Sequence, residues 1–137
     1  MTTPALDFYF DFGSPNAYLA YRTIPAIERR IGASFAMKPA LLGGVFKATG
    51  NRSPVEANAG ILPKVAFEKR QMQRFVTSHG IDRYRHNPFF PINTLGLMRG
   101  VLAARKLGLF ERYVEAVYQG MWEQELNMGD PTIVSQV

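Results

Sequence analysis

Ser14 is the residue of this sequence whose type and position are best suited to chemistry. It stands in the stretch DFYFDFGSPNAYLAY, where a strand-like pattern meets a helix-like one. Serine is a favoured N-cap residue, and Pro15 suits the first helical position. N–H groups converge at a helix N-terminus, and the helix dipole stabilises an anion there by up to about 1 kcal/mol. The pattern therefore predicts either a plain helix cap or a hydroxyl that holds an anionic ligand.

The elements that position Ser14 follow from the hydrophobic pattern. Apolar residues alternate over 6–12, which indicates a strand with Asp7 and Asp11 facing solvent. A helix is predicted from the serine to about residue 31, where Gly32 ends it, and Pro25 is expected to kink or interrupt it. The serine is thus predicted to lie at a junction between a strand and a helix.

The remaining chain predicts one more strand and several helices. Residues 34–42 indicate a strand parallel to the first, and 43–60 predict a long loop, because Gly and Asn are frequent there. Helices are predicted over about 63–79, 94–107 and 109–126, with Tyr118 and Trp122 as core or interface residues, and Asp130-Pro131 begins another helix. The expected domain parts are a βαβ part with the active-site loop (1–60), a helical insertion (61–130) and the start of a truncated helix (131–137).

Two strands are too few for an independent sheet. Three or more strands are normally required. We therefore expect the chain to be an incomplete domain whose natural polypeptide continues past Val137 with two more strands and a final helix.

Composition limits the classes of function. The chain has 137 residues, no cysteine, and 16 Lys and Arg against 11 Asp and Glu. The absence of cysteine excludes disulfides, thiolate zinc sites and redox chemistry by the protein's own sulfur. The basic residues are scattered, which indicates a basic surface or an anionic ligand and no nucleic acid.

No metal site is predicted, because His79 and His86 lack acidic partners at ligand spacing. The N-terminal MTTPALDF and the absence of a long apolar run predict no signal peptide, no membrane and a cytoplasmic location.

Five stretches carry a resemblance to a known family. In chain order they are LDFYFDFGSPNAYLA, ALLGGVFKATGN, LPK, FFPINTLGLMR and YQGMWEQELNMGDP. They resemble the 2-hydroxychromene-2-carboxylate isomerases and their relatives, the kappa-class glutathione transferases. The resemblance implies an α/β fold, namely a thioredoxin-like domain of DsbA type with an all-helical inserted domain. It also implies that the C-terminal part of the thioredoxin-like sheet is missing from this chain. In the redox members Cys-Pro-x-Cys occupies this helix start, where this sequence has Ser14-Pro15-Asn16-Ala17.

The resemblance also implies a cofactor and a reaction. Glutathione would bind with its sulfur at Ser14, which would be the catalytic residue and would stabilise the thiolate, since a free thiol with a pKa near about 8.5 is mostly protonated at neutral pH. In the family mechanism the thiolate adds to the conjugated substrate, the chromene ring opens, a carbon–carbon bond rotates, and elimination restores glutathione. The product is trans-o-hydroxybenzylidenepyruvate. A homodimer is also expected.

Four further site residues are carried over by the resemblance. Asn51 and Lys64 are expected to bind the cofactor, and Lys47, Asn51 and Asn93 the aromatic carboxylate substrate. Each has an ordinary alternative: Lys47 and Asn51 as solvated loop residues, Lys64 as a first-turn lysine, and Asn93 as an N-cap. Arg83–His86 could clamp an aromatic acid or form a polar surface turn.

Two other functions stay open. A kappa-like glutathione transferase would share the role of Ser14 but form a stable conjugate. A non-catalytic binding or scaffold protein derived from this fold is the third possibility.

Overall fold

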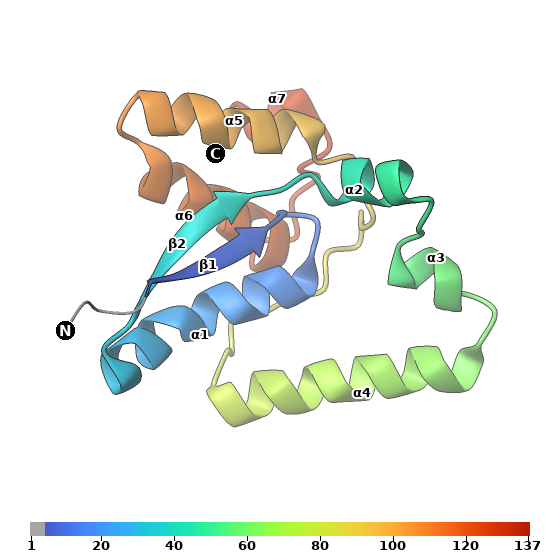
Figure 1. Ribbon diagram of the computed structural model, residues 1–137. Helices are drawn as coiled ribbons and strands as arrows, with labels where there is room; N and C mark the ends of the chain where they lie inside the picture. The colour runs from blue at the N-terminus through green and yellow to red at the C-terminus, as the bar shows by residue number, and fades with distance from the viewer. Residues whose placement is uncertain (1–4) are drawn as a thin grey trace.

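The computed structural model describes residues 5–137, in which two strands and seven helices follow one another (Figure 1). The expectation that no signal peptide is present rests partly on residues 1–4, which lie outside the described residues. In chain order the elements are β1 (Ala5–Phe10), α1 (Pro15–Ile31), β2 (Ser34–Pro39), α2 (Leu42–Thr49), α3 (Pro54–Asn58), α4 (Leu62–His79), α5 (Leu95–Lys106), α6 (Phe110–Trp122) and α7 (Pro131–Val134).

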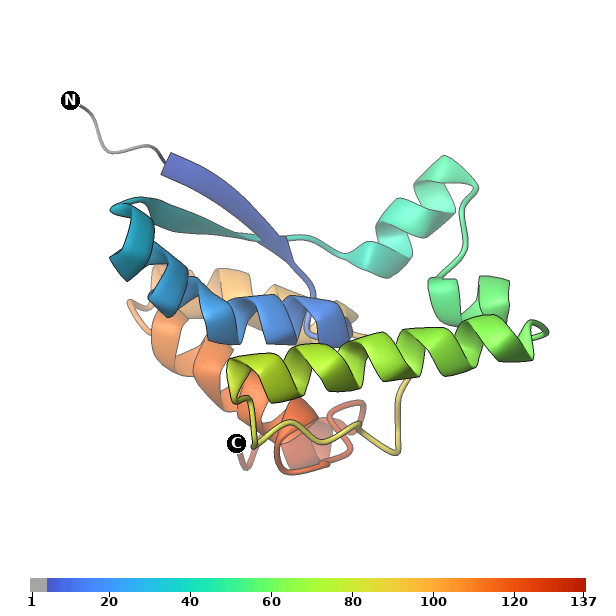
Figure 2. The ribbon, with the colours of Figure 1, turned by 90° about the horizontal axis from the view of Figure 1, so that it is seen from below.

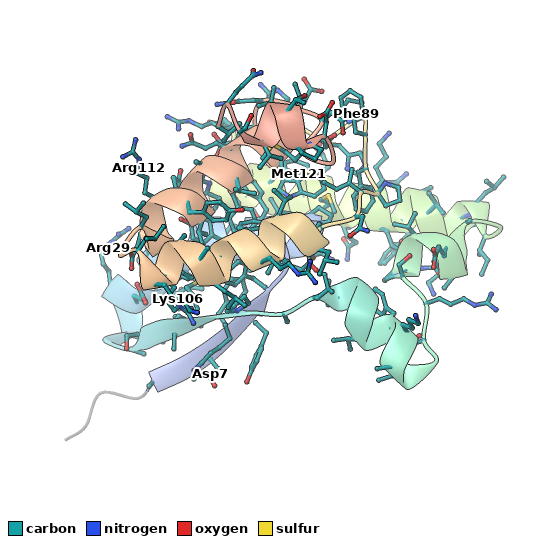
Figure 3. All side chains as sticks on the ribbon, turned by 90° about the horizontal axis from the view of Figure 1, so that it is seen from above. Asp7, Arg29, Phe89, Lys106, Arg112 and Met121 are labelled. Atoms are coloured by element: carbon teal, nitrogen blue, oxygen red, sulfur yellow. The ribbon has the colours of Figure 1, made fainter. Side chains whose placement is uncertain are left out.

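The strands β1 and β2 form a parallel pair with helices on one side. Their register runs from Ala5 opposite Ser34 to Phe10 opposite Pro39. Helices α1, α5 and α6 lie behind one face of the pair (Figures 1 and 2), whereas Asp7 points away from them (Figure 3). The crossover through α1 explains the parallel pairing, because the chain must return to the same end of the sheet before it can pair.

One core joins the strands to the helices. Phe10 and Phe12 point toward α6, where their rings lie 6.1 and 4.9 Å from the ring of Tyr118. The sequence prediction that Tyr118 and Trp122 are core residues is confirmed, since both are 0% exposed. The other buried members of this core are Tyr18, Leu19, Ile81, Leu97, Met98, Val101, Val114, Val117, Met121 and Met128.

Several predicted boundaries differ from the structure. The predicted loop 43–60 is wrong, because it contains most of α2 and all of α3. The strand predicted over 34–42 ends at Pro39, and the strand predicted over 6–12 ends at Phe10. The last long helix ends at Trp122 rather than near residue 126, because the chain reaches a left-handed conformation at Glu125, with φ of 56°.

Pro25 does not interrupt α1, which continues to Ile31 and ends at Gly32 with a φ of 65°. Proline within a helix costs about 3 kcal/mol. The buried residues of α1, Tyr18, Leu19 and Ile24, all precede the proline, and their burial anchors this part of the helix and offsets that cost.

The described residues form a two-stranded sheet, as the sequence predicts. The division at residues 60 and 130 stays a prediction. Within residues 5–137 no helix is both long and apolar enough to cross a membrane.

Candidate functional site at the N-terminus of α1

Ser14 lies at the turn that joins β1 to α1. It is the N-cap of α1, and its Oγ accepts a hydrogen bond from the Ala17 N–H at 3.1 Å. Its own N–H donates to the Asp11 carbonyl at 3.0 Å. The residue is half-buried. Its hydroxyl proton has no acceptor within residues 5–137, so the O–H can donate to a ligand while Oγ caps the helix.

Asp11 supports this turn, and its predicted exposure is wrong. The residue is 2% exposed. Its Oδ1 accepts the Gly13 N–H at 2.9 Å, and its Oδ2 accepts the Leu42 N–H at 2.8 Å. The period-two pattern fails here because β1 ends at Phe10, so Asp11 belongs to the turn. The signal that could have identified it is an Asp two residues before a Gly, which is typical of an Asx turn.

Two further contacts hold the turn from the helical part of the chain. The indole N–H of Trp122 donates to the Phe12 carbonyl at 2.8 Å inside the core. The Thr94 methyl group packs so closely on Gly13 that a Cβ at this glycine would lie 3.0 Å from it. The close contact favours glycine at position 13, and the turn is held from α6 and from the start of α5.

The site lies at the carboxyl ends of the strands, where ligands bind in open α/β sheets. The segments that meet there are the turn after β1, the start of α2 and the start of α5. Asn93 adjoins the last of these, and its Oδ1 accepts the Leu95 N–H at 3.0 Å. The N-cap residue of α5 is Thr94, so Asn93 is not the N-cap of its ordinary alternative, although its side chain satisfies the first N–H of the helix. Its role in binding stays a prediction.

Lys47, Asn51 and Lys64 are exposed, on elements beyond the strand ends. Helices α2 and α3 lead away from the strands (Figure 1), and the first half of α4 extends past the N-terminus of α1 (Figure 2). Asn51 accepts only the N–H of the next residue in the described chain. The structure shows no side-chain contact that brings these residues to Ser14 across residues 5–137, so their roles stay predictions.

A cluster of paired charges joins α1 to α6 away from Ser14. Arg22 donates two hydrogen bonds to Glu115, at 2.9 and 3.0 Å, and a third to Glu123. Burial would raise the pKa of Glu115, but the hydrogen bonds from Arg22 and Tyr21 lower it. Burial raises the pKa of Tyr18, which donates to Glu123, to about 12. The groups satisfy one another, which indicates a structural link between the two helices.

Two surface hollows lie elsewhere. One of about 340 Å³ borders the charge cluster and the loop after α4, and one of about 370 Å³ borders α6 and α7. Neither is lined by Ser14. Among the residues that the structure describes, no three His, Asp or Glu side chains are grouped so as to hold a metal ion.

The fold and the junction between β1 and α1 define a class of protein. The family model described as a DSBA-like thioredoxin domain matches residues 5–137, and the chain belongs to this family. This confirms the predicted fold class.

Several proteins similar to this chain carry the name 2-hydroxychromene-2-carboxylate isomerase. The chain is 30% identical to a 2-hydroxychromene-2-carboxylate isomerase of Sphingobium xenophagum over 88% of this chain, and 28% identical to one of Pseudomonas sp. (strain C18) over 85% of it. A solved structure of 2-hydroxychromene-2-carboxylate isomerase covers 97% of this chain and 64% of its own, with a TM-score of 0.68 and 25% identity. Glutathione S-transferase kappa 1 of Caenorhabditis elegans is 40% identical over 37% of this chain and 23% of its own length.

The chain spans 59% and 53% of the lengths of the two curated isomerases. The resemblance to this group of proteins is therefore confirmed over nearly all of this chain, while it covers little more than half of each relative.

Proposed function

We propose that this chain is part of a glutathione-dependent isomerase that acts on 2-hydroxychromene-2-carboxylate or a similar small aromatic carboxylate. The observation that carries the proposal is the half-buried Ser14, whose free O–H lies at the N-terminus of α1. The alignment with named isomerases over most of the chain supports it. The homodimer and the cytoplasmic location stay predictions.

The residues at this helix start fit a bound thiolate. Ser14 Oγ caps α1, so its proton can donate to an anion without loss of the cap. The helix dipole adds stabilisation there. Glutathione, when bound, would supply the nucleophilic sulfur that the chain lacks, because the chain has no cysteine.

The other residues have roles that the resemblance implies and that their chemistry permits. Lys47 would attract the substrate carboxylate, and Asn51 would hydrogen-bond the substrate or the cofactor. Lys64 would bind a carboxylate of glutathione, and the side-chain amide of Asn93 would donate to the substrate near Ser14. Ser14 would hold the sulfur in place through a charge-assisted hydrogen bond.

The test is incubation of the protein with glutathione and 2-hydroxychromene-2-carboxylate. Isomer formed without consumption of glutathione supports the proposal. A stable conjugate formed with consumption would instead support a kappa-like transferase, which the short match at 40% identity favours as the second candidate. Absence of turnover would refute both activities for this chain and leave a non-catalytic binding or scaffold protein.

Two serine variants separate catalysis from capping. Ser53 is also an N-cap followed by proline, and its Oγ accepts the Glu56 N–H at 3.3 Å. Ser14→Ala and Ser53→Ala should each lose about 1 kcal/mol of stability as a cap is removed. Only Ser14→Ala should also raise the pKa of bound glutathione and add about 1.5–3 kcal/mol to the chemical barrier, with a smaller loss of affinity. An unchanged pH–rate profile in Ser14→Ala would make the serine a plain cap.

A further inference from the structure

The carboxylate of Asp11 links two elements that the proposed function requires to lie together. Its oxygens accept N–H groups from Gly13, in the turn that leads into α1, and from Leu42, the first residue of α2. The residue is 2% exposed, and no Lys, Arg or His pairs with it within residues 5–137. A buried carboxylate without a cation depends on such N–H donors.

Helix α2 receives its N-terminal cap from Asp11. The residue at its own N-cap position is Leu41, which offers no side-chain acceptor. Asp11 lies 31 positions before Leu42, yet its Oδ2 satisfies the first N–H of the helix at 2.8 Å. A carboxylate at a helix N-terminus is also favoured by the dipole. This side chain therefore helps to fix the position of α2 relative to the turn, together with the backbone bond from the Ala40 N–H to the Phe10 carbonyl at 2.9 Å.

The same residue, through its side chain and its backbone carbonyl, sets the conformation from which α1 begins. Its Oδ1 bond to Gly13 and its carbonyl bond to the Ser14 N–H close the turn, and the serine then caps α1. We propose that Asp11 is a positioning residue that orients the Ser14 hydroxyl and fixes the start of α2, the helix that carries Lys47, at the same turn. This inference rests on the proposed function for the role of Ser14, but the geometry of the link does not.

Asp11→Asn tests the proposal with little change of shape. An amide has one acceptor oxygen, so its NH₂ group must face one of the two N–H donors. Glu28→Gln is the matched control, because Glu28 Oε1 accepts a backbone N–H, that of Phe35, at 2.8 Å near the opposite end of the sheet. Both variants are expected to melt at a lower temperature than the wild type.

The pKa of the thiol of bound glutathione distinguishes a positioning role of Asp11 from a general loss of stability. This pKa is measured from the ultraviolet absorbance of the thiolate. Asp11→Asn should raise this pKa by about one unit. At a pH below the pKa, this corresponds to an about tenfold loss of thiolate. Glu28→Gln should leave it unchanged. In a Ser14→Ala background, Asp11→Asn should add no further shift, because the two residues act on the same interaction. An unchanged pKa in Asp11→Asn, an equal shift in Glu28→Gln, or additive shifts with Ser14→Ala would overturn the inference.

Amide hydrogen exchange keeps this test separate from the proposed function. If glutathione binds the wild type without a lowered thiol pKa, or does not bind, the proposed function fails, and the link is then judged from exchange alone. In the wild type the N–H groups of Gly13, Leu42 and Ala17 should be protected, although none of these bonds is a regular helix or strand bond. Asp11→Asn should reduce all three protections, and Glu28→Gln none of them. Unprotected groups in the wild type, or an unaltered Ala17 in Asp11→Asn, would show that Asp11 does not position Ser14.

Discussion

Removal of the Tyr118 hydroxyl should stabilise the protein. Tyr118 is 0% exposed, and its ring lies 4.8 Å from that of Tyr21 and 4.9 Å from that of Phe12. Its hydroxyl is the buried side-chain group without a hydrogen-bond partner in the described part of the chain. Burial holds the pKa of this hydroxyl well above its ordinary value. The core thus contains a hydroxyl that loses its hydrogen bonds to water on folding and gains none from the protein in their place.

The magnitude follows from the burial of this single oxygen atom. A hydroxyl buried without a partner costs about 1–3 kcal/mol, and one atom loses only a few tenths of a kcal/mol in dispersion contacts. Tyr118→Phe should therefore raise the free energy of unfolding by about 1–2 kcal/mol. Tyr18→Phe is the matched control, because Tyr18 is also 0% exposed while its O–H donates to Glu123 at 2.9 Å. That variant should lower the free energy of unfolding by about 1–3 kcal/mol.

Chemical denaturation measures both changes. Trp122 is the single tryptophan of the chain, so its fluorescence reports on this core, and circular dichroism reports on the helices. Coincident transitions by the two probes would justify a two-state treatment. A loss of more than 1 kcal/mol in Tyr118→Phe would refute the reasoning, because it would mean that the hydroxyl makes a favourable interaction in solution.

Three other predictions concern the core, alkaline pH and thiol chemistry. Trp122→Phe leaves the Phe12 carbonyl without its donor and opens a cavity, so unfolding monitored by circular dichroism should become about 2–4 kcal/mol easier; a loss below 1 kcal/mol would contradict this. Burial raises the pKa of Tyr18 and of Tyr84 from 10.0 to about 12. The contribution of these two tyrosines to the free energy of unfolding is therefore complete below pH 10 and is lost as the pH rises toward 12. Denaturation midpoints that stay constant over this window would oppose that assignment. The protein alone should not catalyse reduction of a protein disulfide by dithiothreitol, because it has no cysteine; a rate proportional to protein concentration would disprove this.

Local sequence rules predicted α1 because its signals lie within the helix and its ends. Ser14 caps it, Pro15 begins it and Gly32 ends it in a left-handed conformation, as predicted. At Pro25 the same rules predicted a kink or an interruption, and the helix is not interrupted there. Core contacts on neighbouring turns maintain the helix, and these contacts come from distant segments that a local pattern does not contain.

Helix α2 could not be predicted for a similar reason. Gly43 and Gly44 lower helix propensity, and Leu41 gives no capping signal. The acceptor that begins the helix is Asp11, which itself appeared to be a solvent-facing strand residue. The cap of α2 was missed because the interaction joins positions 31 residues apart, whereas Asp11 itself carries a local Asx-turn signal.

The candidate site was predicted only in part. The sequence placed Ser14 correctly, because a strand, a turn and a cap are all local signals. Trp122 was predicted as a core residue, but its bond to the turn required the position of α6. The predicted roles of Lys47, Asn51, Lys64 and Asn93 depend on how their side chains approach a ligand, which sequence spacing does not define.

The distant cap of α2 has a consequence for the order of folding. An isolated helix shorter than about 12–15 residues is marginal in water, and α2 has eight residues. Its cap becomes available only after the chain has closed the loop from Asp11 to Leu42, which requires α1 and the pairing of β1 with β2. We therefore expect α2 to form after the βαβ unit, so that substitutions in α2 accelerate unfolding with little effect on the folding rate measured by stopped-flow fluorescence.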